Sequence, residues 1–145
     1  MPSEHCGFSD ANWALDKVTR KSTSGGIIMR GSHYIKSWAK TQSLVALSSA
    51  ESELHVVIKC VSEMFGIKSA LKDWGMQIAA VVKSDASAAL GISQRQGLGQ
   101  VRHLDCSYLY IQQVNAEKRM KLKKVPGARH PAAICTKGIN SGNIK

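Results

Sequence analysis

The chain has 145 residues, of which 43% are hydrophobic and 6% aromatic, and its formal net charge is +10. This size and composition fit one globular domain over the whole chain, and they exclude a disordered protein. The apolar runs are too short to span a bilayer, and the first residues lack the apolar core of a signal peptide, so we expect no membrane partner. The abrupt start predicts a piece of a longer chain.

The four cysteines and five histidines are scattered, with no CxxC pair and no zinc-finger spacing. Free thiols in a reducing compartment are the simpler interpretation, so we expect an intracellular protein. The positive charge collects at the C-terminal end, where residues 101–145 carry nine Lys or Arg against two Asp or Glu. A basic end on a compact domain favours a polyanionic partner such as nucleic acid, and the alternative is a surface that only keeps the protein soluble.

The first third of the chain predicts a three-stranded meander. Residues 5–15 alternate as a strand, with Cys6, Phe8 and Asp10 on one face. A polar turn leads to a second strand over residues 25–31, and a third follows over residues 32–42.

A long helix comes next. Ser48 and Glu51 form an S-x-x-E capping box, so the helix is predicted to begin at Ser48 or Ser49 and to end at Gly75, with Gly66 marking a kink.

The rest of the chain alternates between strands and helices. Residues 77–85 predict a strand buried on both faces, residues 119–127 predict a basic fifth strand, and helices are predicted over residues 86–96, over residues 101–118 and after residue 130. The order β-β-β-α-β-α-α-β-α predicts an α/β fold, a mixed five-stranded sheet flanked by helices.

Three acids stand where an acid is structurally costly, and the first two along the chain are Asp10 and Glu53. Asp10 continues an apolar strand face, unless the strand ends there and leaves it in water. Glu53 stands at the top of the core-facing stripe of the long helix, where an acid needs a partner or a metal. The alternative is that Glu53 lies close enough to the helix end to reach solvent. The stripe continues with Val57, Cys60 and Met64.

Asp85 directly follows the fourth strand, where sites in α/β sheets tend to lie, although Asp is also a favoured N-cap. With Asp10 and Glu53 it predicts a cluster of three acids. Packed like charges destabilise a fold unless a cation lies between them, and carboxylate oxygens select a hard cation such as Mg²⁺ or Mn²⁺. In a basic protein this site indicates phosphodiester cleavage, with two ions about 4 Å apart.

Five segments follow one another along the chain: SDANWALDKVTRKSTSGG, SWAKTQSLVALSSAESEL, SDASAAL, VRHLDCSYLYIQQ and KVPGARHPAAICTK. In this order they resemble the ribonuclease H domain of copia-type retrotransposon Pol polyproteins. The resemblance implies a ribonuclease H-like fold and makes Asp10, Glu53 and Asp85 the first three catalytic, metal-binding acids. The fourth acid of the family, the Asp of its ADxLTK motif, is replaced by Ala133.

The resemblance implies a metal-dependent endonuclease that cuts the RNA strand of RNA/DNA hybrids during reverse transcription, with two Mg²⁺ or Mn²⁺ ions if the site is intact. The alternative is a decayed or repurposed domain that binds hybrids but cuts weakly or not at all, because of Ala133. A weaker alternative is a structural tether. The resemblance also makes the chain the C-terminal piece of a polyprotein, with its reverse transcriptase domain as a partner.

We further expect a monomeric domain in a cytoplasmic particle or the nucleus, and a surface position for the loop histidine His130. The basic residues near the C-terminus are predicted to hold phosphates, and the alternative is an ordinary solvated face. They are Lys118, Arg119, Lys121, Lys123, Lys124 and Arg129.

Overall fold

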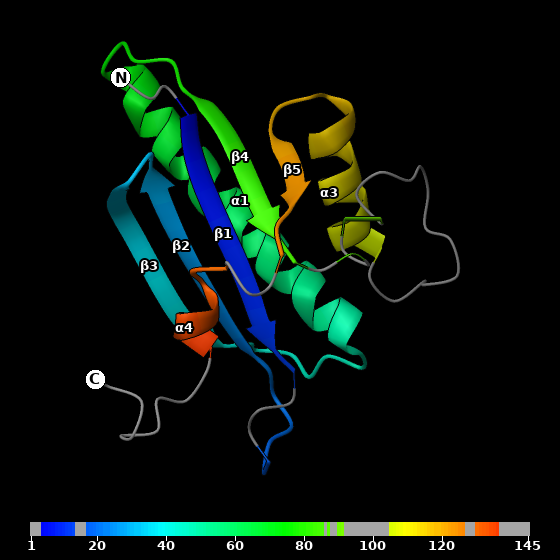
Figure 1. The fold of residues 1–145 in the computed structure, drawn as a ribbon. Coiled ribbons are helices and arrows are strands. Elements are labelled where there is room, and N and C mark those ends of the chain that lie inside the picture. Colours follow the sequence, from blue (N-terminus) through cyan, green and yellow to red (C-terminus); the bar gives the residue numbers. More distant parts are fainter. Residues whose placement is uncertain are drawn as a thin grey trace, which may run out of the picture.

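A mixed five-stranded sheet forms the centre of the computed structural model (Figure 1). The structure describes residues 4–13, 17–85, 87, 90–91, 105–126 and 130–136, without the side chains of residues 105–108, 133 and 134. The strands lie in the order β3-β2-β1-β4-β5. Their bounds are Glu4–Asn12 for β1, Thr23–Arg30 for β2, His33–Thr41 for β3, Ala79–Ser84 for β4 and Lys121–Lys124 for β5.

The strand directions agree with the predicted order of elements. β1 pairs antiparallel with β2, which pairs antiparallel with β3, so the predicted meander is confirmed. β4 runs parallel to both β1 and β5. The carboxyl ends of β1, β4 and β5 therefore meet at one end of the sheet, together with the end of β3 and the start of β2.

Helices lie on both faces of the sheet. The long helix α1 spans Ser49–Asp73 and packs on one face, while the short helix α4, Ala133–Thr136, lies on the other (Figure 1). A third helix, α3, spans Asp105–Ala116. Its buried residues Ile111 and Val114 join the core that α1 and the sheet enclose.

The alternation of β1 decides which side chains meet which helix. Gly7 faces α1, where a Cβ would come within 2.7 Å of the Cys60 sulfur, so glycine lets the helix close onto the strand. The even-numbered residues Cys6, Phe8 and Asp10 point to the opposite face, the one that carries α4. The predicted common face of these three residues is confirmed.

The predicted start of α1 is confirmed. Ser48 is the N-cap, and its side-chain oxygen accepts a hydrogen bond from the Glu51 amide at 3.1 Å. The Glu51 carboxylate accepts from the Leu47 amide at 2.9 Å, one residue further out than in a standard capping box. α1 continues as one helix through Gly66 and ends at Asp73, with Trp74 as its C-cap and Gly75, whose φ is +77°, just beyond.

The remaining elements largely match. β4 has three consecutive buried residues, Ala80 to Val82, as expected for a strand covered on both faces. The helix predicted over residues 86–96 falls mostly outside the described residues. Within that range the structure describes residues 87, 90 and 91, and all three are helical. Among the helices of the described residues, none has both the length and the hydropathy needed to cross a bilayer.

Candidate metal centre

Asp10 lies near the carboxyl end of β1 and exposes only 9% of its surface. Its Oδ2 accepts a hydrogen bond from the Thr136 hydroxyl of α4 at 2.5 Å, and Thr136 itself is 3% exposed. The Asn12 side-chain amide donates to the Thr136 carbonyl at 3.4 Å. Two contacts thus join β1 to α4 across a sequence separation of more than a hundred residues, and one of them orients the Asp10 carboxylate.

Glu53 points from the start of α1 toward the same place and is half-buried. Burial raises the pKa of its carboxyl group to about 8, helped by the negative charges of Asp85 and Asp10 and opposed by a hydrogen bond to the Ala11 backbone. Its Oε2 is buried and has no hydrogen-bond partner in the described part of the chain. The predicted stripe below it is confirmed, since Val57, Cys60 and Met64 are each at most 1% exposed.

Asp85 follows β4 directly. Because Ser84 pairs with Ser9 in the parallel ladder, the next residue on each strand, Asp85 and Asp10, stand side by side. One carboxylate oxygen from each of Asp10, Glu53 and Asp85 lies within 4.8 Å of the other two. The three acids therefore form the predicted cluster.

The donor set of this cluster fits a divalent cation. All three side chains offer oxygen, the ligand that hard cations prefer. The unpartnered Oε2 of Glu53 has the property expected of a ligand atom whose partner is an ion, because buried polar atoms otherwise find hydrogen bonds.

Solved structures with the same architecture establish the fold. LC11-RNase H1, isolated from compost by a metagenomic approach, aligns with a TM-score of 0.66 and 14% identity over 92% of each chain. The same protein in complex with an RNA/DNA hybrid aligns with a TM-score of 0.61 and 12% identity over 88% of each chain. This chain has a ribonuclease H-like fold.

Several sequence relatives of this ribonuclease H-like domain are transposon polyproteins. The retrovirus-related Pol polyprotein from transposon TNT 1-94 of Nicotiana tabacum is 29% identical over 135 residues, which is 92% of this chain and 10% of that protein. The one from transposon RE1 of Arabidopsis thaliana is 41% identical over 71 residues, 49% of this chain and 5% of that protein. No family model matches the chain.

The domain also aligns within a larger viral protein. Prototype foamy virus protease-reverse transcriptase matches with a TM-score of 0.51 and 14% identity, over 97% of this chain and 22% of that one. The resemblance to the ribonuclease H domain of retrotransposon Pol polyproteins is confirmed, and the chain spans a tenth or less of the transposon polyproteins it matches.

The helix that would carry the fourth acid begins at Ala133, whose side chain lies outside the described residues. α4 has the sequence AICT and contains no acid. Within the described residues it reaches the acid cluster through Thr136, a neutral hydroxyl donor. A sequence pattern would not have singled out this threonine, because its role depends on the packing of α4 against β1.

His130 is buried, so its predicted surface position is wrong. It is 5% exposed, and its ring packs edge-on against Phe8 at 5.8 Å between ring centroids. Neither ring nitrogen has a hydrogen-bond partner among the described residues. Phe8 is remote in sequence, and this aromatic contact on the α4 face of the sheet is what removes the loop histidine from solvent.

The basic residues near the C-terminus separate into two groups. Lys121, Lys123 and Lys124 are exposed on β5, and the Lys124 ammonium donates to the Ser87 hydroxyl at 2.5 Å. Lys124 pairs with Ser84, so it lies at the end of the sheet that carries the acids. The others are in the turn before β5 or beyond it: Lys118 and Arg119 are exposed in the turn, and Arg129 lies outside the described residues.

Proposed function

We propose that this domain is a metal-dependent endonuclease that hydrolyses the RNA strand of RNA/DNA hybrids during retrotransposon reverse transcription. The observation that carries the proposal is the acid cluster at the open end of a ribonuclease H-like sheet. The relative solved with an RNA/DNA hybrid supports the substrate class. We also propose a role inside the cell. The retrotransposon relatives and the viral protease-reverse transcriptase support a place beside the reverse transcriptase domain of the same polyprotein.

Asp10, Glu53 and Asp85 would hold one or two divalent cations, Mg²⁺ or Mn²⁺. When bound, such ions stabilise negative charge on the reacting phosphate and lower the pKa of an attacking water. The chain's own residues prepare the site. Thr136 holds the Asp10 carboxylate in one orientation, and the unpartnered Oε2 of Glu53 leaves an oxygen free for a ligand.

A second candidate function is hybrid binding without efficient cleavage. The observation that favours it is Ala133, which removes one negative charge from a site that would hold two divalent ions. The same fold, basic surface and three acids would then bind a hybrid and a cation, but the second ion would be held too weakly to support hydrolysis.

A cleavage assay separates the two candidates. The purified domain is incubated with a hybrid labelled on its RNA strand, in Mg²⁺ or Mn²⁺, beside Asp10→Asn and Ala133→Asp. The matched control is Asp73→Asn, the same substitution at an exposed position at the end of α1. We expect cleavage that falls by about 100-fold or more in Asp10→Asn, because a ligand is lost, and that persists in Asp73→Asn.

The other outcomes are equally decisive. A parent that binds hybrid but cuts only after Ala133→Asp establishes the second candidate. Cleavage that survives Asp10→Asn contradicts the assignment of the metal centre. If Ala133→Asp changes neither cleavage nor metal affinity, residue 133 does not stand at the fourth acid position.

A further inference from the structure

A basic groove of about 350 Å³ lies at the end of the molecule away from the acid cluster. It opens between the second half of α1 and the turn that joins α3 to β5, and Figure 1 shows both at the end of the sheet where β1 and β4 begin. The described lining contains three basic side chains and no acid. The residues are Phe65, Lys68, Ser69 and Lys72 of α1 and Arg119 of the turn.

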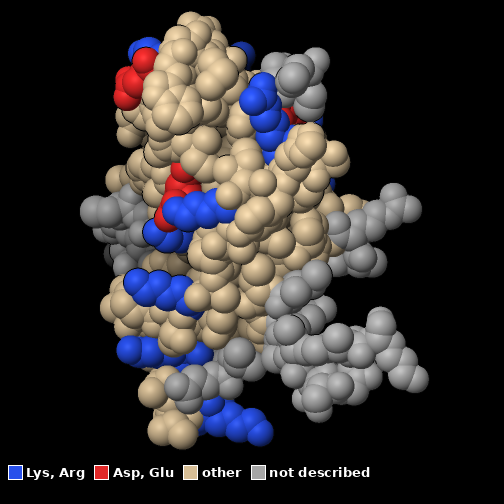
Figure 2. All heavy atoms as spheres, turned by 90° about the vertical axis from the view of Figure 1, so that its left-hand side faces the viewer, with Lys and Arg blue, Asp and Glu red and all other residues tan. Residues whose placement is uncertain are grey.

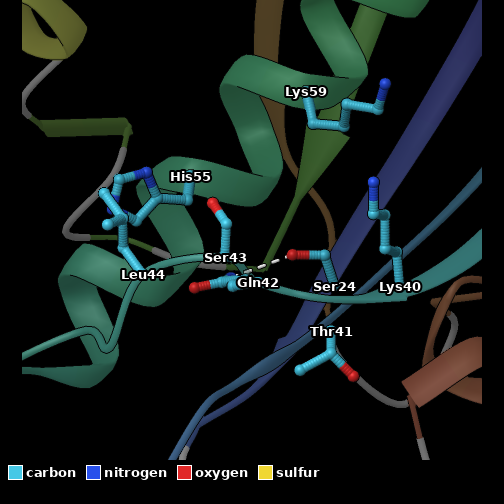
Figure 3. Close-up of a pocket in the computed structure, with 8 residues that line it drawn as sticks. All are labelled: Ser24, Lys40, Thr41, Gln42, Ser43, Leu44, His55 and Lys59. Carbon is cyan, nitrogen blue, oxygen red and sulfur yellow. Dashed lines mark hydrogen bonds between the residues drawn. The ribbon is translucent and has the colours of Figure 1, made fainter.

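The basic groove is far from the acids along α1. Glu53 stands near the start of this helix. At about 1.5 Å per residue, Phe65 lies roughly 18 Å and Lys72 roughly 28 Å further along the axis. The pocket into which Lys40 and Lys59 point is at the acid end, between the end of β3 and the first turns of α1 (Figure 3). The basic groove is therefore separate from the metal centre and from the pocket beside it.

The positive charge in the basic groove is poorly neutralised. The Lys72 ammonium has no ion pair or hydrogen bond among the described residues. Arg119 and Glu117 are 3.7 Å apart, but both side chains are about half exposed, so this ion pair is weak. On the β3 side of the molecule, by contrast, acids lie beside some of the basic side chains (Figure 2). A lysine in the last turn also stabilises a helix C-terminus, which accounts for Lys72 but not for three charges around one cavity.

The shape of the basic groove is fixed by contacts between its two walls. The Lys68 ammonium donates to the Arg119 carbonyl at 3.4 Å, and the Arg119 guanidinium lies over the Phe65 ring, 4.8 Å from its centroid. The Arg119 amide donates to the Val114 carbonyl at 3.2 Å, which closes the turn. A stacked guanidinium keeps its in-plane N–H groups available, and Lys68 keeps further donors. The donors are thus held in place before a ligand arrives, which reduces the entropy lost on binding.

The chemistry of the basic groove favours the carboxylates of a protein. Arginine binds a carboxylate with two parallel hydrogen bonds. Phe65 adds an apolar wall, and aromatic residues together with arginine are enriched where proteins bind proteins. Lys68 and Lys72 are one helical turn apart, about 6 Å between their Cβ atoms. This spacing is close to the roughly 6.6 Å between side chains on one side of an extended segment.

We propose that the basic groove binds an acidic, extended segment of a partner protein, in which alternate side chains are Asp or Glu. Neighbouring carboxylates on one side of that segment lie against Lys68, Lys72 and Arg119. The partner is then attached at the end of the domain away from the acids, and the metal centre stays open. The inference goes beyond the proposed function and does not rest on it.

The test uses a fluorescein-labelled peptide of eight residues, alternating Glu and Ala, and measures its binding by fluorescence anisotropy in 50 mM KCl. The parent is expected to bind it about 10-fold or more tightly than the same peptide with Gln in place of Glu. Lys72→Gln and Arg119→Gln should each weaken binding about 3- to 10-fold, because each removes a charge-assisted contact. Arg119→Lys keeps the charge but loses the planar fork, so it should recover only part of the affinity.

Lys118→Gln is the matched control, since Lys118 precedes Arg119 in the same turn but does not line the basic groove. It should change the affinity for the Glu peptide less than twofold. Losses of equal size in Lys118→Gln, Lys72→Gln and Arg119→Gln would mean attraction by net charge alone and would overturn the proposal. Equal affinity of the parent for the two peptides would also overturn it. Both results leave the proposed function untouched.

A second arm decides between a protein and a nucleic acid. Hybrid binding is measured in EDTA, which prevents metal-dependent cleavage, for the parent, Lys72→Gln and Arg119→Gln. Affinities within twofold of the parent support a site for an acidic protein segment. A loss as large as that for the peptide would assign the basic groove to the phosphate backbone and overturn the proposal. A parent that binds the Glu peptide but no hybrid would support the groove and contradict the proposed function alone.

Discussion

At the scale of single residues, the ionised Glu53 carboxylate destabilises the metal-free fold. Its pKa is raised from 4.5 to about 8 by burial and by Asp85 and Asp10. The folded protein therefore binds this proton more tightly than the unfolded chain does. It follows that stability is highest where Glu53 is protonated, and that it falls as the pH rises from about 4.5 to about 8.

The first prediction is that Glu53→Gln removes this pH dependence. At pH 8 without metal, it should raise the free energy of unfolding by about 1–2 kcal/mol, because a buried charge is replaced by a neutral isostere. Urea unfolding at pH 5 and pH 8 measures the effect.

Glu63 is the control, because its effect on stability has the opposite dependence on pH. Hydrogen bonds from Lys36 and Lys59 lower its pKa, so its contribution is present above its ordinary pKa and is lost as the pH falls. An unchanged pH profile in Glu53→Gln would contradict the prediction.

The second prediction concerns Thr136, which acts on the site through its hydroxyl group rather than through its shape. Thr136→Val keeps the volume but removes the hydrogen bond to Asp10. We expect a loss of about 1–3 kcal/mol in stability and roughly 3- to 10-fold weaker Mn²⁺ binding, because Asp10 loses the donor that orients it. Calorimetric titration with Mn²⁺ measures the affinity. Thr136→Ser should restore it, and failure of that rescue would assign Thr136 a packing role only.

At the scale of elements, the docking of α4 depends on a glycine in β2. A Cβ at Gly25 would lie 2.7 Å from the Cys135 Cβ and 2.8 Å from the Thr136 methyl. Gly25 also pairs with Asp10. Because Gly25 has no side chain, α4 can pack close to the strand at this point and so reach the acid cluster.

The third prediction follows from this contact. Gly25→Ala should cost about 1–3 kcal/mol through overpacking and should weaken Mn²⁺ binding, because α4 must move away from Asp10. Gly66→Ala is the matched control: nothing lies within 4 Å of its added Cβ, and it should stabilise α1 by about 0.5–1 kcal/mol without changing metal affinity. Thermal unfolding and calorimetric titration measure both. Unchanged Mn²⁺ affinity in Gly25→Ala would show that the position of α4 does not affect metal binding.

Elements with a strong local pattern were predictable, and contacts between distant elements were not. The capping box at Ser48 and the apolar stripe below Glu53 locate α1 because both are contained in one helix. His130 and Thr136 escaped the prediction since each is defined by a partner on β1 more than a hundred residues away, Phe8 and Asp10. Short helices such as α4 carry too few residues for a periodic signal.

At the scale of the whole molecule, the same limit applies to charge. The net charge of +10 predicts a polyanionic partner but not where it binds. The fold divides the basic segment. β5 runs parallel to β4 and ends beside the acids, so Lys124 lies at the end of the sheet that carries the acid cluster. Lys118, in the turn before β5, lies toward the opposite end of the sheet. The length of β5, about 10 Å over Lys121–Lys124, and the turn before it lie between the two lysines.

The fourth prediction uses this separation. Lys124→Gln should weaken hybrid binding about 3- to 10-fold at low salt and reduce the salt slope by about 0.9, because its ammonium stands near a duplex that lies at the acid cluster. Lys118→Gln makes the same charge change at the remote end and should alter affinity less than twofold. Fluorescence anisotropy with a labelled hybrid, between 50 and 200 mM KCl, measures the affinity of both variants. Equal losses in the two variants would mean that the protein attracts the duplex through its total charge, and that the long axis of the sheet does not align the substrate.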